Sequence, residues 1–332
     1  MALDEIKVEI LGAESMGVRS MCTMVTTPDL SILLDPGCSL GPRKGHEIPH
    51  PLEYKALHGT TGKILAAAKR CPRLFISHFH HDHYKPRLID ELYIHTSNAL
   101  TKELYDGKEL YLKSQQHHIG RYQESRSRYF KQSVSRLVTT IHDADFQRFV
   151  FGDTIVDFSH PVPHGEPGTK IGHVIMARIS FQDEHFVFAP DVQGPVVEDT
   201  TKFILDTPVD LLFAGGAPFY LSDSLTGFPF GEARRLIVKL HEAIPAIVLD
   251  HHCCRDRVAY EQCIKGVKHA ASGLVASKKH VITSAAEFMG AEPAFLESAR
   301  GELYVDHPPP DSFVAWMQAD PGKRNQVVPP VE

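Results

Sequence analysis

Residues 74–83 read Leu-Phe-Ile-Ser-His-Phe-His-His-Asp-His, an apolar run followed directly by imidazoles and one carboxylate. The apolar run predicts a short buried strand, and the polar run contains the pattern H-x-H-x-D-H. A turn that leaves a strand can direct His78 and His80 at one metal ion, and Asp82 and His83 at a second one. Neutral imidazole and carboxylate are common ligands of zinc and related ions. The alternative is a solvated loop that is rich in histidine by chance, but the complete spacing and the preceding strand favour a metal site.

The composition is that of an ordinary soluble globular protein, with 42% hydrophobic and 23% charged residues among 332. No segment approaches the roughly 20 apolar residues of a membrane helix, and the N-terminal residues lack a signal-peptide pattern. We therefore expect a cytoplasmic protein without a membrane partner. The six cysteines lack C-x-x-C spacing, so neither a disulfide framework nor a cysteine zinc site is expected. Nothing in the sequence indicates an oligomeric state.

Candidate ligands also follow other predicted strands, which is where loops converge on the active site of an α/β protein. A hairpin of 149–151 and 154–158 ends near His160 and His164, and one of 173–180 and 185–189 ends near Asp191. The strand predicted over 246–249 ends near His251 and His252. Further strands are predicted over 6–11, 20–27, 30–35 and 211–214, and helices over 61–70 and 232–242.

The H-x-H-x-D-H stretch resembles the signature of the metallo-β-lactamase superfamily, and four other stretches resemble its remaining motifs in order over residues 6 to about 255. The resemblance implies an α/β fold of the four-layer αβ/βα sandwich type. It also implies that Asp35 supports the metal loop without binding metal, and that Asp191 bridges two ions. His160 competes weakly with His164 as a ligand, and His251 is favoured over His252 because the ligand directly follows the strand's last non-ligand residue. The implied metal ligands are His78, His80, Asp82, His83, His164, Asp191 and His251.

Three shorter stretches, 14–20, 35–37 and 285–288, resemble an uncharacterised, largely archaeal family of predicted metal-dependent hydrolases without a known substrate. We expect one metallo-β-lactamase-fold domain over residues 1–304, with an inserted basic and aromatic segment around 84–145. A Pro-containing C-terminal extension over 305–332, packed on or mobile, is expected to follow.

Two divalent metal ions would give this site a hydrolytic mechanism, because a water held by such ions loses a proton near neutral pH. Asp82 would orient the resulting hydroxide or accept its proton, and His252 or His81 would protonate the leaving group. A hydrogen-bonding role behind the ligands for His252, and a solvent-facing position for His81, remain open. Zinc is the expected metal, although manganese or iron would suit the same ligands.

A basic and aromatic segment, 113–131, suggests the class of substrate. It carries five cations against Glu124 alone, with tyrosines among them. Such a segment suits an anionic partner with stacking bases, such as a nucleotide or a nucleic acid. The alternative is an amphipathic helix with core aromatics and solvated arginines. Arg255, beside the last ligand, would bind a substrate phosphate or pair with Asp250 or Asp256. The candidate substrate-binding residues are Arg121, Arg126, Arg128 and Arg255.

Together these patterns predict a metal-dependent hydrolase of a phosphodiester or phosphate ester, which includes nucleases. An acyl hydrolase acting on a lactone, thioester or amide would use the same ligands in an apolar cleft. An iron-dependent persulfide-oxidising enzyme of the same fold also remains open. The oxygen-reducing diiron type is disfavoured, because it typically carries a glutamate at the position of His80.

Overall fold

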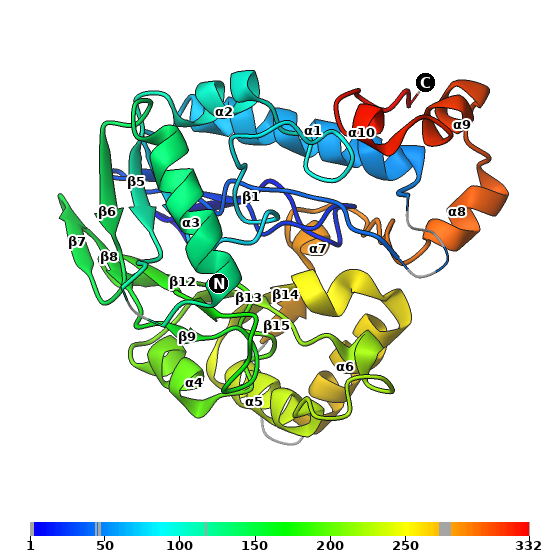
Figure 1. Ribbon diagram of the computed structural model, residues 1–332. Coiled ribbons are helices and arrows are strands. Elements are labelled where there is room, and N and C mark those ends of the chain that lie inside the picture. Colours follow the sequence, from blue (N-terminus) through cyan, green and yellow to red (C-terminus); the bar gives the residue numbers. More distant parts are fainter. Residues whose placement is uncertain (1–2, 44, 46–47, 117, 272–279, 332) are drawn as a thin grey trace.

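Two mixed β-sheets lie face to face, with helices on the outer side of each (Figure 1). The computed structural model describes residues 3–43, 45, 48–116, 118–271 and 280–331. The first sheet has the strand order β1 (Lys7–Ile10), β2 (Thr23–Thr26), β3 (Ser31–Leu34), β4 (Arg73–Ile76), β5 (Glu109–Leu112), β6 (Thr140–Asp143). The second has the order β15 (Val281–Thr283), β14 (Ala246–Asp250), β13 (Leu211–Gly215), β12 (Glu184–Ala189), β11 (Ala177–Phe181), β8 (Thr154–Phe158), β7 (Arg148–Phe151). A short ribbon joins β9 (Val162–Pro163) to β10 (His173–Val174).

The central strands are apolar on both faces, as expected for strands that lie between two other layers. In β4, Phe75 faces the second sheet, whereas Leu74 and Ile76 face the helices of their own half. In β13, Phe213 faces the first sheet, whereas Leu212 faces the other way. Because side chains alternate along a strand, each central strand contributes to two hydrophobic layers.

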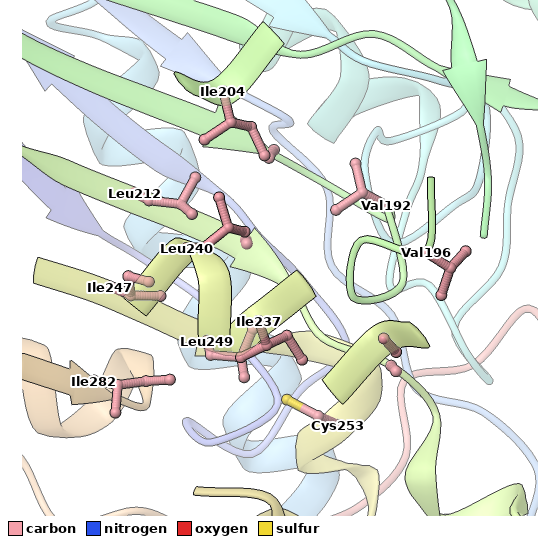
Figure 2. Close-up of a cluster of buried hydrophobic side chains, with 14 of the residues drawn as sticks. Val192, Val196, Ile204, Leu212, Ile237, Leu240, Ile247, Leu249, Cys253 and Ile282 are labelled. Atoms are coloured by element: carbon pink, nitrogen blue, oxygen red, sulfur yellow. The ribbon is translucent and has the colours of Figure 1, made fainter. Parts of the chain in front are cut away.

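Helices cover the outer face of each sheet (Figure 1). The cluster beneath the second sheet packs Leu212, Ile247 and Leu249 against Ile237 and Leu240 of the helices (Figure 2). A second apolar layer lies between the two sheets, and a third lies between the first sheet and the helices that cover it. The molecule therefore has three apolar layers between four layers of secondary structure. The four-layer αβ/βα sandwich predicted from the sequence is confirmed. The first group of helices is α1 (Pro51–Ala68), α2 (Asn98–Tyr105) and α3 (Arg121–Val134), and the second is α4 (Glu198–Leu205), α5 (Phe230–Ala243) and α6 (Arg257–Ala271).

Helix α1 begins ten residues before the helix predicted over 61–70. Gly59 and Gly62 weaken the helical pattern in the sequence. The helix nevertheless starts at Pro51, because the side chains of His50 and Glu53 form a capping box there. Buried side chains such as Tyr54 then pack the first turns against the sheet. Tertiary packing therefore overrides the low intrinsic propensity of this segment.

The interval around 84–145 is not an insertion, in contrast to the expectation from the sequence. It contains β5 and β6, which continue the first sheet in parallel from β4, and the helices α2 and α3. Phe130 of α3 lies in the core of the first half. The interval is therefore an integral part of the sandwich.

The C-terminal extension packs on the first half of the protein. It comprises α8 (Arg300–Asp306), α9 (Asp311–Met317) and α10 (Pro321–Arg324), after the short α7 (Ala285–Phe288). Phe313 and Trp316 of α9 are buried against Tyr54 of α1. The predicted boundary at residue 304 falls inside α8, so the extension continues the domain without a linker.

No helix in the described part of the chain combines the length and the apolar character needed to cross a bilayer.

A buried ion pair attaches this extension to α1, and its removal should destabilise the protein. The guanidinium of Arg300 donates to both carboxylate oxygens of Glu53, at 2.7 and 2.8 Å, and both side chains are fully buried. We predict that Arg300→Ala lowers the free energy of unfolding by about 3–5 kcal/mol, because it leaves a buried carboxylate unpaired. Urea denaturation measures this loss. The control Arg257→Ala, which breaks an exposed pair with Glu261, should change stability little. Equal small effects of both substitutions would show that water replaces the Arg300 contact.

Candidate metal centre

Five chain segments bring ligand-type side chains to the edge where the two sheets meet, and each follows a strand. The segments follow β3, β4, β9, β12 and β14. Because β3 and β4 run parallel, and so do β12, β13 and β14, their carboxyl ends lie at the same edge of each sheet. The residues carried there are Asp35 after β3, His78, His80, Asp82 and His83 after β4, His164 after β9, Asp191 after β12, and His251 and His252 after β14.

The carboxylate of Asp191 lies at the centre of this group. Its Oδ2 atom is 3.1 Å from His78 Nε2, 3.8 Å from His80 Nδ1 and 2.7 Å from His164 Nε2. One ligand atom from each of these four residues lies within 4.8 Å of all the others. The structure therefore brings together the ligands predicted for the first ion.

The other oxygen of Asp191 lies against His251 of a second group, whereas His83 Nε2 of that group is 3.3 Å from Oδ2. Asp191 Oδ1 is 2.6 Å from His251 Nε2, and Asp82 Oδ2 lies 3.7 Å from the same nitrogen. Asp82, His83 and His251 satisfy the same 4.8 Å spacing. Asp191 thus stands between the two groups, where a bridging carboxylate is expected. The assignment of an ion to each group stays a prediction.

The buried donor atoms of this centre fit bound cations. His83 Nε2, His251 Nε2 and Asp191 Oδ1 are shielded from solvent, and none of their contacts with the described residues has hydrogen-bond geometry, although His251 Nε2 lies 2.6 Å from Asp191 Oδ1. Buried polar atoms are normally satisfied, because an unsatisfied one costs about 1–3 kcal/mol. Mixed imidazole and carboxylate donors at these spacings suit zinc, manganese or iron. Coordination would satisfy all three atoms at once.

Asp35 holds the H-x-H-x-D-H loop from behind, as the resemblance implied. Its carboxylate accepts hydrogen bonds from the backbone N–H of Ser77 at 2.7 Å and from the Ser77 hydroxyl at 2.6 Å, and it lies 2.7 Å from His83 Nδ1. With Nδ1 bonded there, His83 presents Nε2 to the centre. Gly37 lets this support approach closely, since a Cβ at that position would lie 2.1 Å from the backbone nitrogen of Tyr84.

Glu14 has a matching role for His251, and sequence reasoning did not identify it. Its Oε2 atom lies 2.7 Å from His251 Nδ1, and its Oε1 atom accepts a hydrogen bond from Arg255 Nε at 2.8 Å. Glu14 is 237 positions away from His251 along the chain, so no local spacing could connect them. The only sequence signal was its place in the 14–20 stretch that carried the family resemblance.

Burial and charge divide the imidazoles into two classes in the metal-free protein. Burial lowers the pKa of His80 to about 4 and the pKa of His78 well below its usual value, so both rings are neutral. Burial also acts on His251, but the carboxylates of Asp191 and Glu14 outweigh it and raise the pKa to about 9. The neutral rings are already in the form that binds metal, whereas a cation must displace a proton from His251.

Comparison with known proteins identifies the family. No family model matches the chain. A UPF0282 protein of Methanopyrus kandleri is 36% identical over 303 residues, which cover 90% of this chain and 99% of the relative. A UPF0282 protein of Pyrococcus furiosus is 35% identical over 300 residues, covering 90% and 92% of the two chains. The chain belongs to the UPF0282 family.

One solved structure similar to this UPF0282 chain is a metallo-β-lactamase fold protein from Bacillus subtilis. Its sequence is 15% identical, the TM-score is 0.47, and the match covers 80% of this chain and 93% of the other. Another is an isothiocyanate hydrolase from Delia radicum gut bacteria, with 13% identity, a TM-score of 0.49, and coverage of 80% and 94%.

His251 and His252 of the UPF0282 chain differ in their surroundings. His251 is fully buried between Glu14 and Asp191. The side chain of His252 is 12% exposed, and its Nε2 atom lies farther from Asp191 Oδ1, at 3.6 Å. Burial, together with the charge of Arg255, holds the pKa of His252 well below its usual value. This geometry agrees with the preference for His251 as the ligand.

Arg255 does not pair as the sequence suggested. Neither Asp250 nor Asp256 is its partner. Its guanidinium instead donates to Glu14 at 2.8 Å and to Asp82 Oδ2 at 3.5 Å, and the residue is buried. The carboxylate of Asp250 is occupied by backbone N–H groups of Ser15, His251 and Ala285. Arg255 thus braces the second group of ligands through Glu14.

The three arginines of α3 do not converge on one place. Arg121 lines a cavity at the start of the helix. Arg126 donates to the backbone oxygen of Phe79 in the metal loop, at 3.3 Å. Arg128 pairs with Glu124 on the solvent side, and its side chain is 64% exposed. The aromatic residues also divide, because Phe130 is buried whereas Tyr122 and Tyr129 are exposed.

Metal content should depend on Asp191 more than on any histidine, because its carboxylate contacts histidines of both groups. We predict that His80→Ala reduces bound metal from about two equivalents toward one, whereas Asp191→Ala weakens both sites. Elemental analysis of protein purified without added metal gives the stoichiometry. A single tightly bound ion that survives Asp191→Ala would contradict the bridging position.

The two adjacent histidines should separate in the same measurement. We predict that His252→Ala keeps its metal and that His251→Ala loses the second equivalent, because only His251 is clamped by Glu14 with Nε2 directed at both carboxylates. The reverse result would make His252 the ligand.

Proposed function

We propose that this UPF0282 protein is a metal-dependent hydrolase that cleaves a phosphodiester or phosphate ester, with a nucleotide or nucleic acid as its substrate class. The observation that carries the hydrolase proposal is the convergence of two groups of donors on the carboxylate of Asp191. Two divalent ions bound there, zinc in our proposal, would supply a nucleophile from water at neutral pH and stabilise negative charge on the substrate.

One side of the centre is accessible to a substrate. The side chains of His80 and Asp82 are 23% and 13% exposed, whereas His78, His83 and His251 are fully buried. A substrate would therefore approach past His80, Asp82 and His252. In our proposal Asp82, which Arg255 holds in place, accepts a proton from the attacking water. His252 would donate a hydrogen bond to the leaving group.

A cavity lined by two cations, at the end of the loop that follows His164, supports a phosphate-containing substrate. It has a volume of about 660 Å³, and its lining includes Arg121, Lys170, His118 and His173. It also includes Gly120, the N-cap of α3, which offers no side-chain cap and so leaves backbone N–H groups free for an anion. The two cations at this cavity, Arg121 and Lys170, suit phosphate oxygens.

This cavity is connected to the ligands through one loop. The loop 164–172 starts at His164 and ends at Gly172, which lines the cavity, and the His164 N–H donates to the Gly172 carbonyl at 2.9 Å. A phosphate bound in the cavity would therefore contact the far end of the loop that begins at His164. Tyr122, which is exposed at the same cavity, offers a ring for stacking with a base.

Substitution of the two cavity cations should affect binding of substrate rather than chemistry. We predict that the double variant Arg121→Ala/Lys170→Ala raises KM for a chromogenic phosphodiester about tenfold and leaves metal content unchanged. A charge-assisted contact is worth about 1.5–3 kcal/mol when it is buried, and each cation should contribute less than that at this partly open site. The salt dependence of kcat/KM should also weaken, because fewer counterions are released on binding.

The matched control is Arg128→Ala, which removes an arginine of the same helix that does not line the cavity. It should leave KM unchanged. A parallel screen of phosphomonoester, lactone and thioester substrates tests the class itself. If lactone or thioester is turned over and the phosphate esters are not, the acyl alternative replaces our proposal. If the double variant is folded and kinetically normal, the cavity is not the substrate site.

A further inference from the structure

A second group of metal-ligand side chains lies apart from the candidate metal centre. His58 is in α1, whereas Glu91 and His95 are in the loop between β4 and α2. One ligand atom from each of these residues lies within 4.8 Å of the other two, the same spacing as in the groups around Asp191. None of the three belongs to the groups at the sheet edge.

The contacts within this group leave a coordinating atom unused. The rings of His58 and His95 are 4.2 Å apart, and His95 Nδ1 lies 2.5 Å from Glu91 Oε2. His58 Nε2 is shielded from solvent and has no hydrogen-bond partner among the described residues. Its burial without a partner costs about 1–3 kcal/mol, which a bound cation would remove.

The loop holds Glu91 and His95 in fixed positions. Asp90 Oδ1 accepts hydrogen bonds from the backbone N–H groups of Tyr93 and Ile94, and Asp90 and Thr96 are joined by an antiparallel bridge. The Glu91 N–H donates to the carbonyl of Asn325, at the end of α10. Hydrogen bonds within the loop therefore hold Glu91 and His95 next to α1, and a hydrogen bond from the C-terminal extension holds the loop itself.

Lys85 connects this loop to the candidate metal centre. Its Nζ atom donates to the carbonyls of Cys38 and Ile94, next to Gly37 and His95 respectively. Lys85 is a cation near His58, but its ammonium group is already bound by these two carbonyls. Lys85, two residues after the H-x-H-x-D-H motif, thus contacts the loop that carries Glu91 and His95.

We propose that His58, Glu91 and His95 form a further binding site for a divalent transition metal of the zinc class, which ties α1 to the loop after the motif. Two imidazoles and one carboxylate are a known ligand combination for zinc, with a water in the fourth position. The side chain of His95 is 17% exposed, so a water can reach the site. The site braces the fold and takes no part in the proposed hydrolysis.

The test uses the full-length protein loaded with Co²⁺, whose visible bands report tetrahedral coordination. We expect His58→Gln to bind one equivalent less than the wild type and to lose the corresponding bands, while turnover by the candidate metal centre is retained. Removal of metal should also lower Tm by several degrees more in the wild type than in His58→Gln, because the variant has no such ion to lose.

The matched control is His142→Gln. His142 also pairs with a glutamate, Glu109, at 3.0 Å, but it belongs to no group of three ligands among the residues that the structure describes. This variant should keep the full stoichiometry. If His58→Gln does not fold, Glu91→Gln replaces it, because an amide keeps the shape and the hydrogen bond to His95 but is a weaker ligand. Equal Co²⁺ content in the wild type and the folded variants would overturn the proposal and leave only a ring contact between His58 and His95, with His95 hydrogen-bonded to Glu91. The experiment compares the wild type with variants that differ by one metal equivalent at His58, Glu91 and His95. A negative result would therefore leave the proposal for the metal centre at Asp191 unaffected.

Discussion

The carboxylate of Asp191 is completely buried, and the rest of the site is arranged around that charge. A buried carboxylate is costly unless charged or hydrogen-bonding groups surround it. Here imidazoles from three other strand ends approach it, at 2.7 Å for His164 and 2.6 Å for His251. Such an approach requires two sheets whose parallel strands end at one edge, and the sandwich supplies that geometry. The fold thus provides the edge, and the buried charge explains why neutral and protonated histidines both occur there.

His83 and His251 each have a carboxylate partner on the side away from Asp191. The separation of these residues along the chain decides how well the centre could be predicted. His78, His80, Asp82 and His83 lie within six residues, so their spacing alone indicated a metal site. Asp191 and His251 were predictable because they follow apolar strands in the order of known motifs. Glu14 was not predictable, because its contact with His251 joins the loop after β1 to the end of β14. Long-range pairs of this kind depend on how the two halves pack, which no local pattern encodes.

The fold follows the same division. Short apolar strands such as β3, β4, β12 and β14 were predicted close to their observed bounds, since both faces are buried and each run is continuous. The role of residues 84–145 was wrong, because basic and aromatic residues on the outside of α3 hid the strands β5 and β6 on either side of it. The beginning of α1 was missed because its stability comes from packing and from a capping box rather than from helix propensity.

Backbone conformation gives an independent indication of where the protein sacrifices stability for function. Asp35, Asp191 and His251 have φ angles of 44°, 48° and 64°, in the left-handed region that non-glycine residues seldom occupy. Each such residue costs of order 1 kcal/mol, and strained positions cluster at functional sites. All three lie just after strands, where the chain must turn sharply to bring a side chain back toward the sheet edge. Glycine would adopt these angles more easily but carries no side chain, so the strain persists where the side chain itself is required. His95 shares this conformation, with φ of 49°, although it lies outside the sheet edge. The metal site that we propose at His95 would give this residue a reason to keep its imidazole in place of glycine.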